Sequence, residues 1–145
     1  MRHLLRPVVL VTLLAAGCQP SQDISMAVGE QFHNSGGTSV DLGTTVLGEW
    51  ERVCVVGPYS SDASIAKTLG FPWPTKGRST IASNEGVTLL LFVRQGTVTS
   101  WVEHPRASGD FTNISGRCFE RSQAKFRQVN HPPKGWAGLF PSNEA

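Results

Sequence analysis

The chain has 145 residues, with 13 lysines and arginines against 11 aspartates and glutamates, and a mean hydropathy of −0.13. We expect residues 1–17 to be removed, which takes away Arg2 and Arg6 and leaves 128 residues with 11 basic and 11 acidic side chains. This length fits one domain with a hydrophobic core. The balanced charge excludes the basic excess on which nucleic-acid binding depends, so we expect no nucleic-acid partner.

The N-terminus combines a basic head, a short apolar run and small residues. Arg2 and Arg6 precede residues 8–17, a run of ten residues in which Thr12 is the one polar member. A membrane-spanning helix needs about 20 apolar residues, so this run is too short to cross a bilayer. The pattern predicts a secretory signal peptide over residues 1–17.

The residues at the end of this run, Ala15-Ala16-Gly17-Cys18, resemble the lipobox of bacterial lipoproteins, although that family usually has Leu where this chain has Ala15. The resemblance implies that Cys18 becomes the first mature residue and carries diacylglyceryl and acyl groups, and two or more such chains hold a protein stably on a membrane. Gln19, in place of an aspartate, implies the outer membrane, facing the periplasm. Membrane is thus one expected partner.

Residues 18–35 are predicted to form the lipidated cysteine and a tether. The alternative for the segment SMAVGEQF is an edge strand. Residues 36–145 are predicted to form a single globular domain with a loop-like tail from His131. Within it, residues 36–50 suggest short strands and turns, and WERVCVVG predicts an interior strand that ends at Gly57-Pro58.

A short helix is predicted in SSDASIAKTLGFP, capped by Ser60 or Ser61 and ended by Gly70 and Pro72. It is too short to be stable alone, so we expect it to lie on a sheet.

The segment EGVTLLLFVRQGTVTSWVEHP predicts a hairpin around Gln95-Gly96. We expect a three-residue loop that pairs Val93 with Thr97 and Leu89 with Trp101, because a two-residue turn would force Gln95 to positive φ. The run 89–93 is apolar on both faces, which predicts a central strand.

The segment 117–129 is compatible with strand or helix, and we favour a strand. On a strand, Cys118, Ala124 and Phe126 point one way; the other face carries Arg121, Gln123, Lys125 and Arg127. Together the elements predict an α+β fold, a small mainly antiparallel sheet with one short helix packed on it.

Cys54 and Cys118 remain as an even pair in an oxidising compartment, and we expect them to form a disulfide. Two free thiols or a metal pair are the alternatives, but CxxC spacing and nearby histidines are lacking. The closed loop of about 65 residues would contribute about 4 kcal/mol.

Two groups of residues are candidates for partner binding. Trp73 lies between two prolines with Lys76 and Arg78 close behind, a stiff aromatic and basic loop suited to a protein groove or a sugar-phosphate headgroup. The alternative is that Trp73 fills the core under the helix. The second group is the basic row Arg121, Lys125 and Arg127. The alternative is that acidic side chains from residues 19–62 lie beside this row and neutralise it.

Catalytic signatures are missing from the sequence: HExxH, GxSxG, GxxxxGK[ST] and GxGxxG do not occur. Glu103 and His104 would face opposite sides of a strand and so would not act as a pair. Asn113-Ile114-Ser115 matches the N-glycosylation sequon, but in a bacterial envelope protein we interpret this match as a chance occurrence. We therefore expect neither catalytic residues nor a cofactor or metal.

The sequence favours a lipid-anchored, non-enzymatic binding or structural module of the bacterial envelope, with an envelope protein or an anionic glycan or lipid headgroup as partner. The alternative is an inhibitor of a periplasmic or host lysozyme or protease. A hydrolase with an unmarked site around His104 ranks lower.

Overall fold

The computed structural model describes residues 22–144, so the expected signal peptide and Cys18 lie outside the described residues. Two antiparallel sheets dominate a mixed α+β fold, as predicted. The α-helices and strands, in chain order, are α1 (Gln22–Asn34), β1 (Ser39–Asp41), α2 (Leu42–Thr45), β2 (Arg52–Val56), α3 (Asp62–Leu69), β3 (Val87–Arg94), β4 (Thr97–Pro105), β5 (Cys118–Glu120), β6 (Lys125–Val129) and β7 (Gly138–Pro141). Three 3-10 turns, Arg106–Ser108, Thr112–Ile114 and Arg121–Gln123, connect the later strands.

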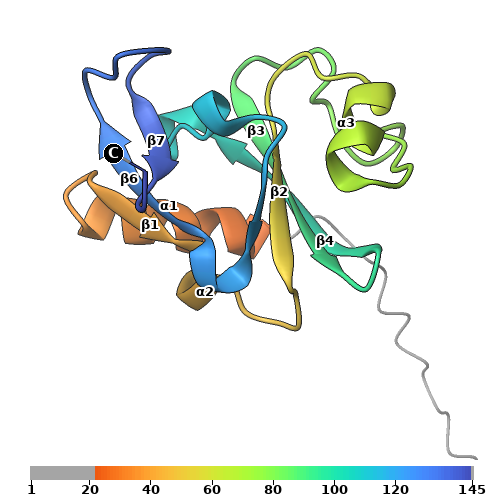
Figure 1. Ribbon diagram of the computed structural model, residues 1–145, viewed down its shortest axis with the longest axis horizontal. Helices are drawn as coiled ribbons and strands as arrows, with labels where there is room; N and C mark the ends of the chain where they lie inside the picture. Colours follow the sequence, from red (N-terminus) through yellow and green to blue (C-terminus); the bar gives the residue numbers. More distant parts are fainter. Residues whose placement is uncertain (1–21, 145) are drawn as a thin grey trace, which may run out of the picture.

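The larger sheet has the strand order β4-β3-β2-β5, and the smaller has the order β1-β6-β7 (Figure 1). Strands β2 and β3 are therefore interior strands, which confirms both sequence predictions.

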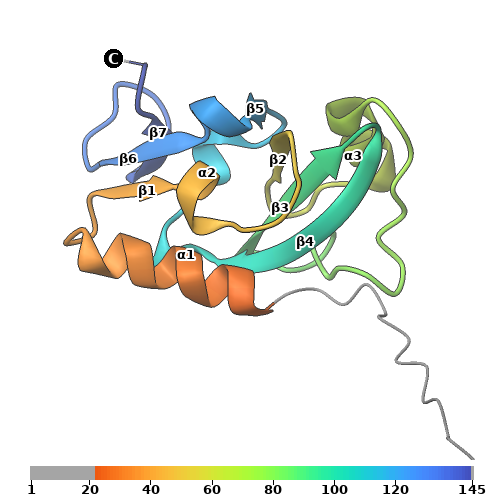
Figure 2. The ribbon, with the colours of Figure 1, turned by 90° about the horizontal axis from the view of Figure 1, so that it is seen from below.

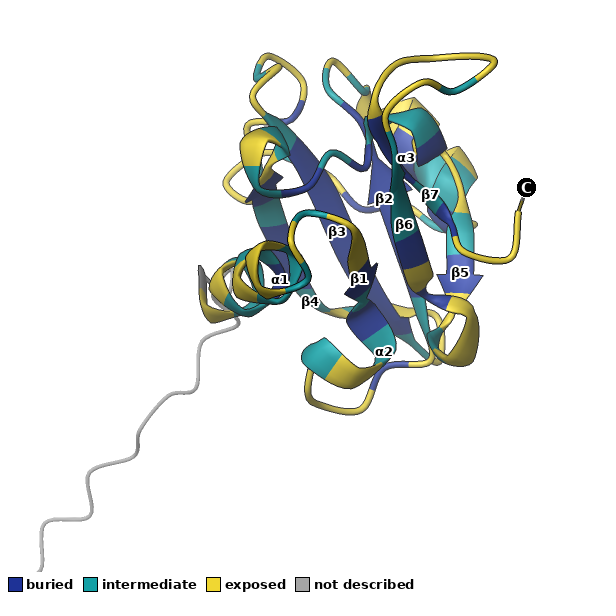
Figure 3. Ribbon diagram, turned by 90° about the vertical axis from the view of Figure 1, so that its left-hand side faces the viewer, coloured by how far each residue is buried: buried dark blue, intermediate teal, exposed yellow. Residues whose placement is uncertain are grey.

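The larger sheet is buried on both faces. Leu90 and Phe92 point into the core shared with the smaller sheet and α1, whereas Leu89 and Leu91 point into a second core under α3. Figure 3 shows β3 buried along most of its length. This double burial explains why the strand is apolar at every position.

Helix α3 has the predicted ends. The Ser61 hydroxyl accepts a hydrogen bond from the Ser64 amide, and Gly70 ends the helix with φ of 86°. Ile65 and Leu69 are buried against the larger sheet, which supplies the packing that eight residues of helix need.

Residues 22–34 form helix α1, so the predicted tether and the alternative edge strand are both wrong over this range. Ile24, Val28 and Phe32 lie four residues apart on one helix face and pack on the first core. The helix lies along β4 and reaches β1 (Figure 2). Within residues 22–144, no helix has the length and hydrophobicity that a membrane span requires.

The β3–β4 hairpin has a different register from the predicted one. Arg94 pairs with Thr97, so the loop has two residues, with φ of 48° at Gln95 and 70° at Gly96. A bulge after Phe92 shifts the pairing, and Leu91 rather than Leu89 faces Trp101. The type I′ turn matches the twist of the strands, and this outweighs the cost of a positive φ at Gln95.

The segment 117–129 is neither one strand nor a helix: β5 and β6 are separated by the 3-10 turn. Ala124 and Phe126 are buried, as the strand prediction required. The tail from His131 is not loop throughout, because β7 pairs with β6.

The predicted disulfide is present. Cys54 lies directly opposite Cys118 on the paired strands β2 and β5, with an S–S distance of 2.02 Å. It borders the second core beneath α3.

Candidate functional site

Trp73 is buried, with 7% of its surface exposed, so the proposed surface anchor is instead part of the core. Its ring meets Trp101 edge to face at 5.5 Å between centroids, and the Arg78 guanidinium lies 5.3 Å from the indole centroid. Lys76 is exposed beside them. The alternative interpretation of this loop is therefore the correct one.

The predicted basic row is split between two elements. Arg121 belongs to the 3-10 turn Arg121–Gln123, whereas Lys125 and Arg127 lie on β6. Lys125 is exposed, and the half-buried Arg127 donates a hydrogen bond from Nη2 to the Glu144 carbonyl at 2.7 Å. Arg121 and Lys125 line one shallow hollow, and Arg127 follows two residues after Lys125 on the same face of β6.

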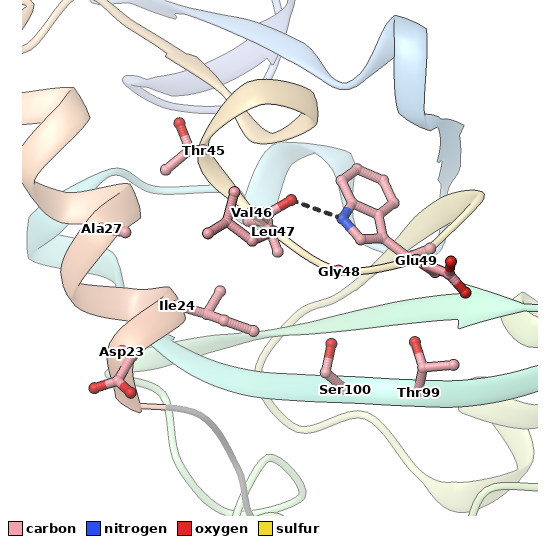
Figure 4. A pocket seen from close by; sticks show the side chains of 11 residues that line it. Asp23, Ile24, Ala27, Thr45, Val46, Leu47, Gly48, Glu49, Thr99 and Ser100 are labelled. Carbon is pink, nitrogen blue, oxygen red and sulfur yellow. Dashed lines mark hydrogen bonds between the residues drawn. The ribbon is translucent and has the colours of Figure 1, made fainter.

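A groove lies between the first turns of α1, the segment 45–50 and strand β4. We call it the α1 groove; it has a volume of about 560 Å³. Its lining residues are Asp23, Ile24, Ala27, Thr45, Val46, Leu47, Gly48, Glu49, Trp50, Thr99 and Ser100. Figure 4 shows Ile24 directed toward the segment that carries Val46 and Leu47, with the Thr99 and Ser100 hydroxyls facing the same space.

Arg121 holds the loop that forms one wall of the α1 groove. Its guanidinium donates to the carbonyls of Gly48 at 2.6 Å, Val46 at 3.1 Å and Gly43 at 3.2 Å. The same group lies 4.7 Å from the centroid of the Trp50 ring, whose Nε1 donates to the Val46 carbonyl at 3.0 Å. The wall is therefore fixed by a planar donor that fits several carbonyls at once.

The α1 groove is apolar inside and acidic at its rim. Leu47 is 83% exposed although its neighbour Val46 is buried, so this side chain stands uncovered at the edge of the hollow. Asp23 and Glu49 supply the rim charges, and Glu49 forms an ion pair with Arg94. Ile24, Ala27, Val46, Leu47 and Trp50 supply the apolar lining, so the groove is equipped to bind an apolar group.

His104, the candidate base of the hydrolase hypothesis, lies away from the α1 groove and is fully buried. Its Nε2 lies 3.1 Å from the Ser108 carbonyl, which can only accept, so Nε2 carries the proton. Nδ1 then accepts from the Ser25 hydroxyl at 3.0 Å. Glu103 faces the opposite side, where its carboxylate accepts hydrogen bonds from Ser79 and Thr80, as the strand geometry predicted.

Burial lowers the pKa of His104, and the hydrogen bond to Ser108 opposes this only in part. The imidazole therefore stays neutral and ties α1 to the larger sheet through Ser25. No carboxylate is among the hydrogen-bond partners of its two ring nitrogens. The arrangement has the geometry of a structural bridge inside the protein.

In residues 22–144, no three histidine, cysteine, aspartate or glutamate side chains are grouped so that they would hold a metal ion. The residues that form the α1 groove come from three separate segments, and no local motif in the sequence marks them. Comparison with known proteins found no matching family model, no similar curated protein and no similar solved structure.

Proposed function

We propose that the protein is a lipid-anchored, non-enzymatic binding module of the bacterial envelope, attached to the outer membrane on its periplasmic side. In this proposal the α1 groove receives a segment of another envelope protein. The observation that carries it is that Asp23 and Ile24, five and six residues after Cys18, line the groove.

Cys18 and Gln22 are four residues apart, so an extended chain separates them by at most about 14 Å. Asp23 and Ile24, in the first turn of α1, already line the groove. With acyl groups on Cys18, the groove opens close to the lipid headgroups. A partner held there would be positioned at the membrane surface.

The lining favours a segment with an apolar side chain next to a basic one. Ile24, Val46 and Leu47 offer apolar contact, and Asp23 offers a carboxylate at the rim. The wall held by Arg121 is ordered before binding, which reduces the entropy that association costs. A rigid, uncovered leucine beside a hollow is a suitable central contact for an interface.

The two other functional hypotheses used different residues as their sites. The inhibitor hypothesis used the small disulfide-stapled domain and its rigid Pro-Trp-Pro loop, in which Trp73 is buried. The hydrolase hypothesis used an assembled site around His104, whose hydrogen-bond partners are a hydroxyl and a carbonyl.

Photo-crosslinking in living cells tests the proposal. A photoreactive residue replaces Leu47, and the matched control replaces Tyr59, which is 63% exposed and lies outside the α1 groove. We expect position 47 to give a discrete protein adduct that position 59 does not give. The adduct should weaken when Ile24→Asp places a charge in the groove.

Adducts confined to phospholipid would contradict the proposal of a protein partner. Identical adducts from positions 47 and 59 would contradict the proposal that the α1 groove is the binding site. The anchor is tested separately by intact mass. A chain that retains residues 1–17, or a mature chain without acyl mass, would remove the membrane part of the proposal.

A further inference from the structure

A second hollow is lined by residues of β6, β7 and the loop between them. These two strands lie at the end of the molecule away from the first turn of α1 (Figures 1 and 2). We call this hollow the cationic pocket. Its volume is about 330 Å³, and Arg127, Val129, Pro132, Pro133, Lys134 and Phe140 line it.

Strand register puts the apolar floor and the first cation on one face. Arg127 pairs with Phe140 across β6 and β7, and Val129 follows two residues after Arg127 on the same face. Phe126 and Leu139 point the other way and are buried in the first core. The outward face therefore presents a guanidinium next to apolar side chains.

The charges in the cationic pocket are mainly positive. Arg127 donates to a backbone carbonyl, that of Glu144, and among residues 22–144 neither Arg127 nor Lys134 forms an ion pair. Glu144 also lines the hollow, and its carboxylate forms an ion pair with Arg117. Two cations thus remain available to an incoming anion.

The loop that carries Lys134 is held in place by Asn113. The Asn113 amide donates from Nδ2 to the Trp136 carbonyl at 2.8 Å and accepts from the Trp136 amide at 3.3 Å. Gly135 has φ of 81°, and a Cβ there would lie 2.3 Å from Asn113 Oδ1, so the approach requires glycine. The pocket wall is consequently formed before any ligand arrives.

We propose that the cationic pocket binds a small organic carboxylate whose apolar end rests on Val129, Phe140 and the two prolines. Arginine matches a carboxylate with two parallel hydrogen bonds, and Lys134 adds a point charge. A volume near the lower end of ligand sites limits the ligand to roughly the size of a dipeptide. The chemistry is shared by the C-terminus of a peptide and by a free aliphatic acid. This inference does not depend on the anchor or on the α1 groove.

The test is an NMR titration of the full chain carrying Cys18→Ser, with amide shifts as the readout. The probes are N-acetyl-Ala-Ala with a free carboxylate, the same dipeptide as its C-terminal amide, and hexanoate. We expect the free acid to shift residues of β6, β7 and the intervening loop, and the amide to bind at least about tenfold more weakly, since a charged hydrogen bond is lost.

Arg127→Gln and Lys134→Gln should each weaken binding of the free acid by about tenfold, whereas the matched surface change Lys76→Gln should leave it unchanged. Arg127→Lys, which preserves the charge but not the paired donors, should have an intermediate effect. An unaltered spectrum away from the pocket shows that each variant is folded.

Binding of the dipeptide alone would identify peptide C-termini as the source of the carboxylate. Binding of both acids would identify apolar carboxylates in general. Equal affinity for the dipeptide acid and its amide would overturn the proposal. So would the absence of amide shifts with both the dipeptide acid and hexanoate at millimolar concentrations.

Discussion

At the scale of single residues, arginines close together in the sequence have different roles. The Arg121 guanidinium donates hydrogen bonds to the carbonyls of Gly43, Val46 and Gly48, whereas Arg117 forms an ion pair with Glu144. Arg127 faces the cationic pocket. The basic character of the segment was visible in the sequence, but the carbonyls that occupy Arg121 come from residues more than 70 positions away.

Arg121→Lys should loosen the wall of the α1 groove, because an ammonium cannot reach three carbonyls in one plane. We expect faster hydrogen exchange at the amides of residues 47–49 and a loss of about 2 kcal/mol in the free energy of unfolding. Lys125→Gln, which removes an exposed charge nearby, should change neither quantity. Unchanged exchange in Arg121→Lys would show that the wall is held by other contacts.

His104 should make stability depend on pH just below neutrality. The unfolded chain takes up a proton on this residue as pH falls through its ordinary value of 6.5, whereas the lowered pKa keeps the folded imidazole neutral. The free energy of unfolding should therefore decrease as the pH falls below about 6.5. Urea titrations at several pH values measure it.

His104→Gln should reduce this slope, while the exposed His131→Gln should preserve it. An equal slope in both variants would mean that His104 does not carry the effect.

At the scale of elements, those with strong local signals were predicted and those set by distant contacts were not. Strand β3 and helix α3 follow from the apolar run 89–93 and from Ser61 and Gly70. Helix α1 was missed although Ile24, Val28 and Phe32 have helical spacing, a signal that its polar composition concealed. Strand β7 exists only because β6 lies beside it.

The groove could not be predicted for the same reason. Its walls come from α1, the segment 45–50 and β4, and only the packing of the sheets brings these together. The disulfide was predictable because, of the three cysteines, Cys18 is assigned to the expected lipid anchor, which leaves Cys54 and Cys118 as one pair.

Gln95→Asn should stabilise the hairpin by about 0.5 kcal/mol, because asparagine adopts positive φ more readily than glutamine. Chemical denaturation measures the gain. Nuclear Overhauser contacts test the register independently: Leu91 should contact the strand opposite at Trp101. A contact of Leu89 with Trp101 would instead support the three-residue loop.

At the scale of the whole molecule, the larger sheet is the central layer between two cores, and the disulfide joins its edge strand β5 to β2. The bridge spans a sequence separation of 64 residues, so most of the domain lies between its ends. Breaking it should free a large part of the unfolded chain while leaving most folded contacts intact.

Reduction of Cys54–Cys118 should lower the free energy of unfolding by about 4 kcal/mol. The comparison is made in a Cys18→Ser background, so that only one pair is present, and the variant Cys54→Ala/Cys118→Ala provides a control without reductant. A loss below about 1 kcal/mol in both would show that the unfolded chain is compact without the bridge.

Helix α1 is both the first described element and a wall of the first core, with Val28 fully buried and Ser25 bound to His104. Cys18 lies four positions before Gln22, so a pulling force applied at residue 18 acts on the N-terminal end of α1. The helix lies along β4, so such a force would peel it from one end and rupture its contacts in sequence rather than all at once. In a protein tethered at that residue, a pulling force would act first on the contacts through which α1 covers the first core.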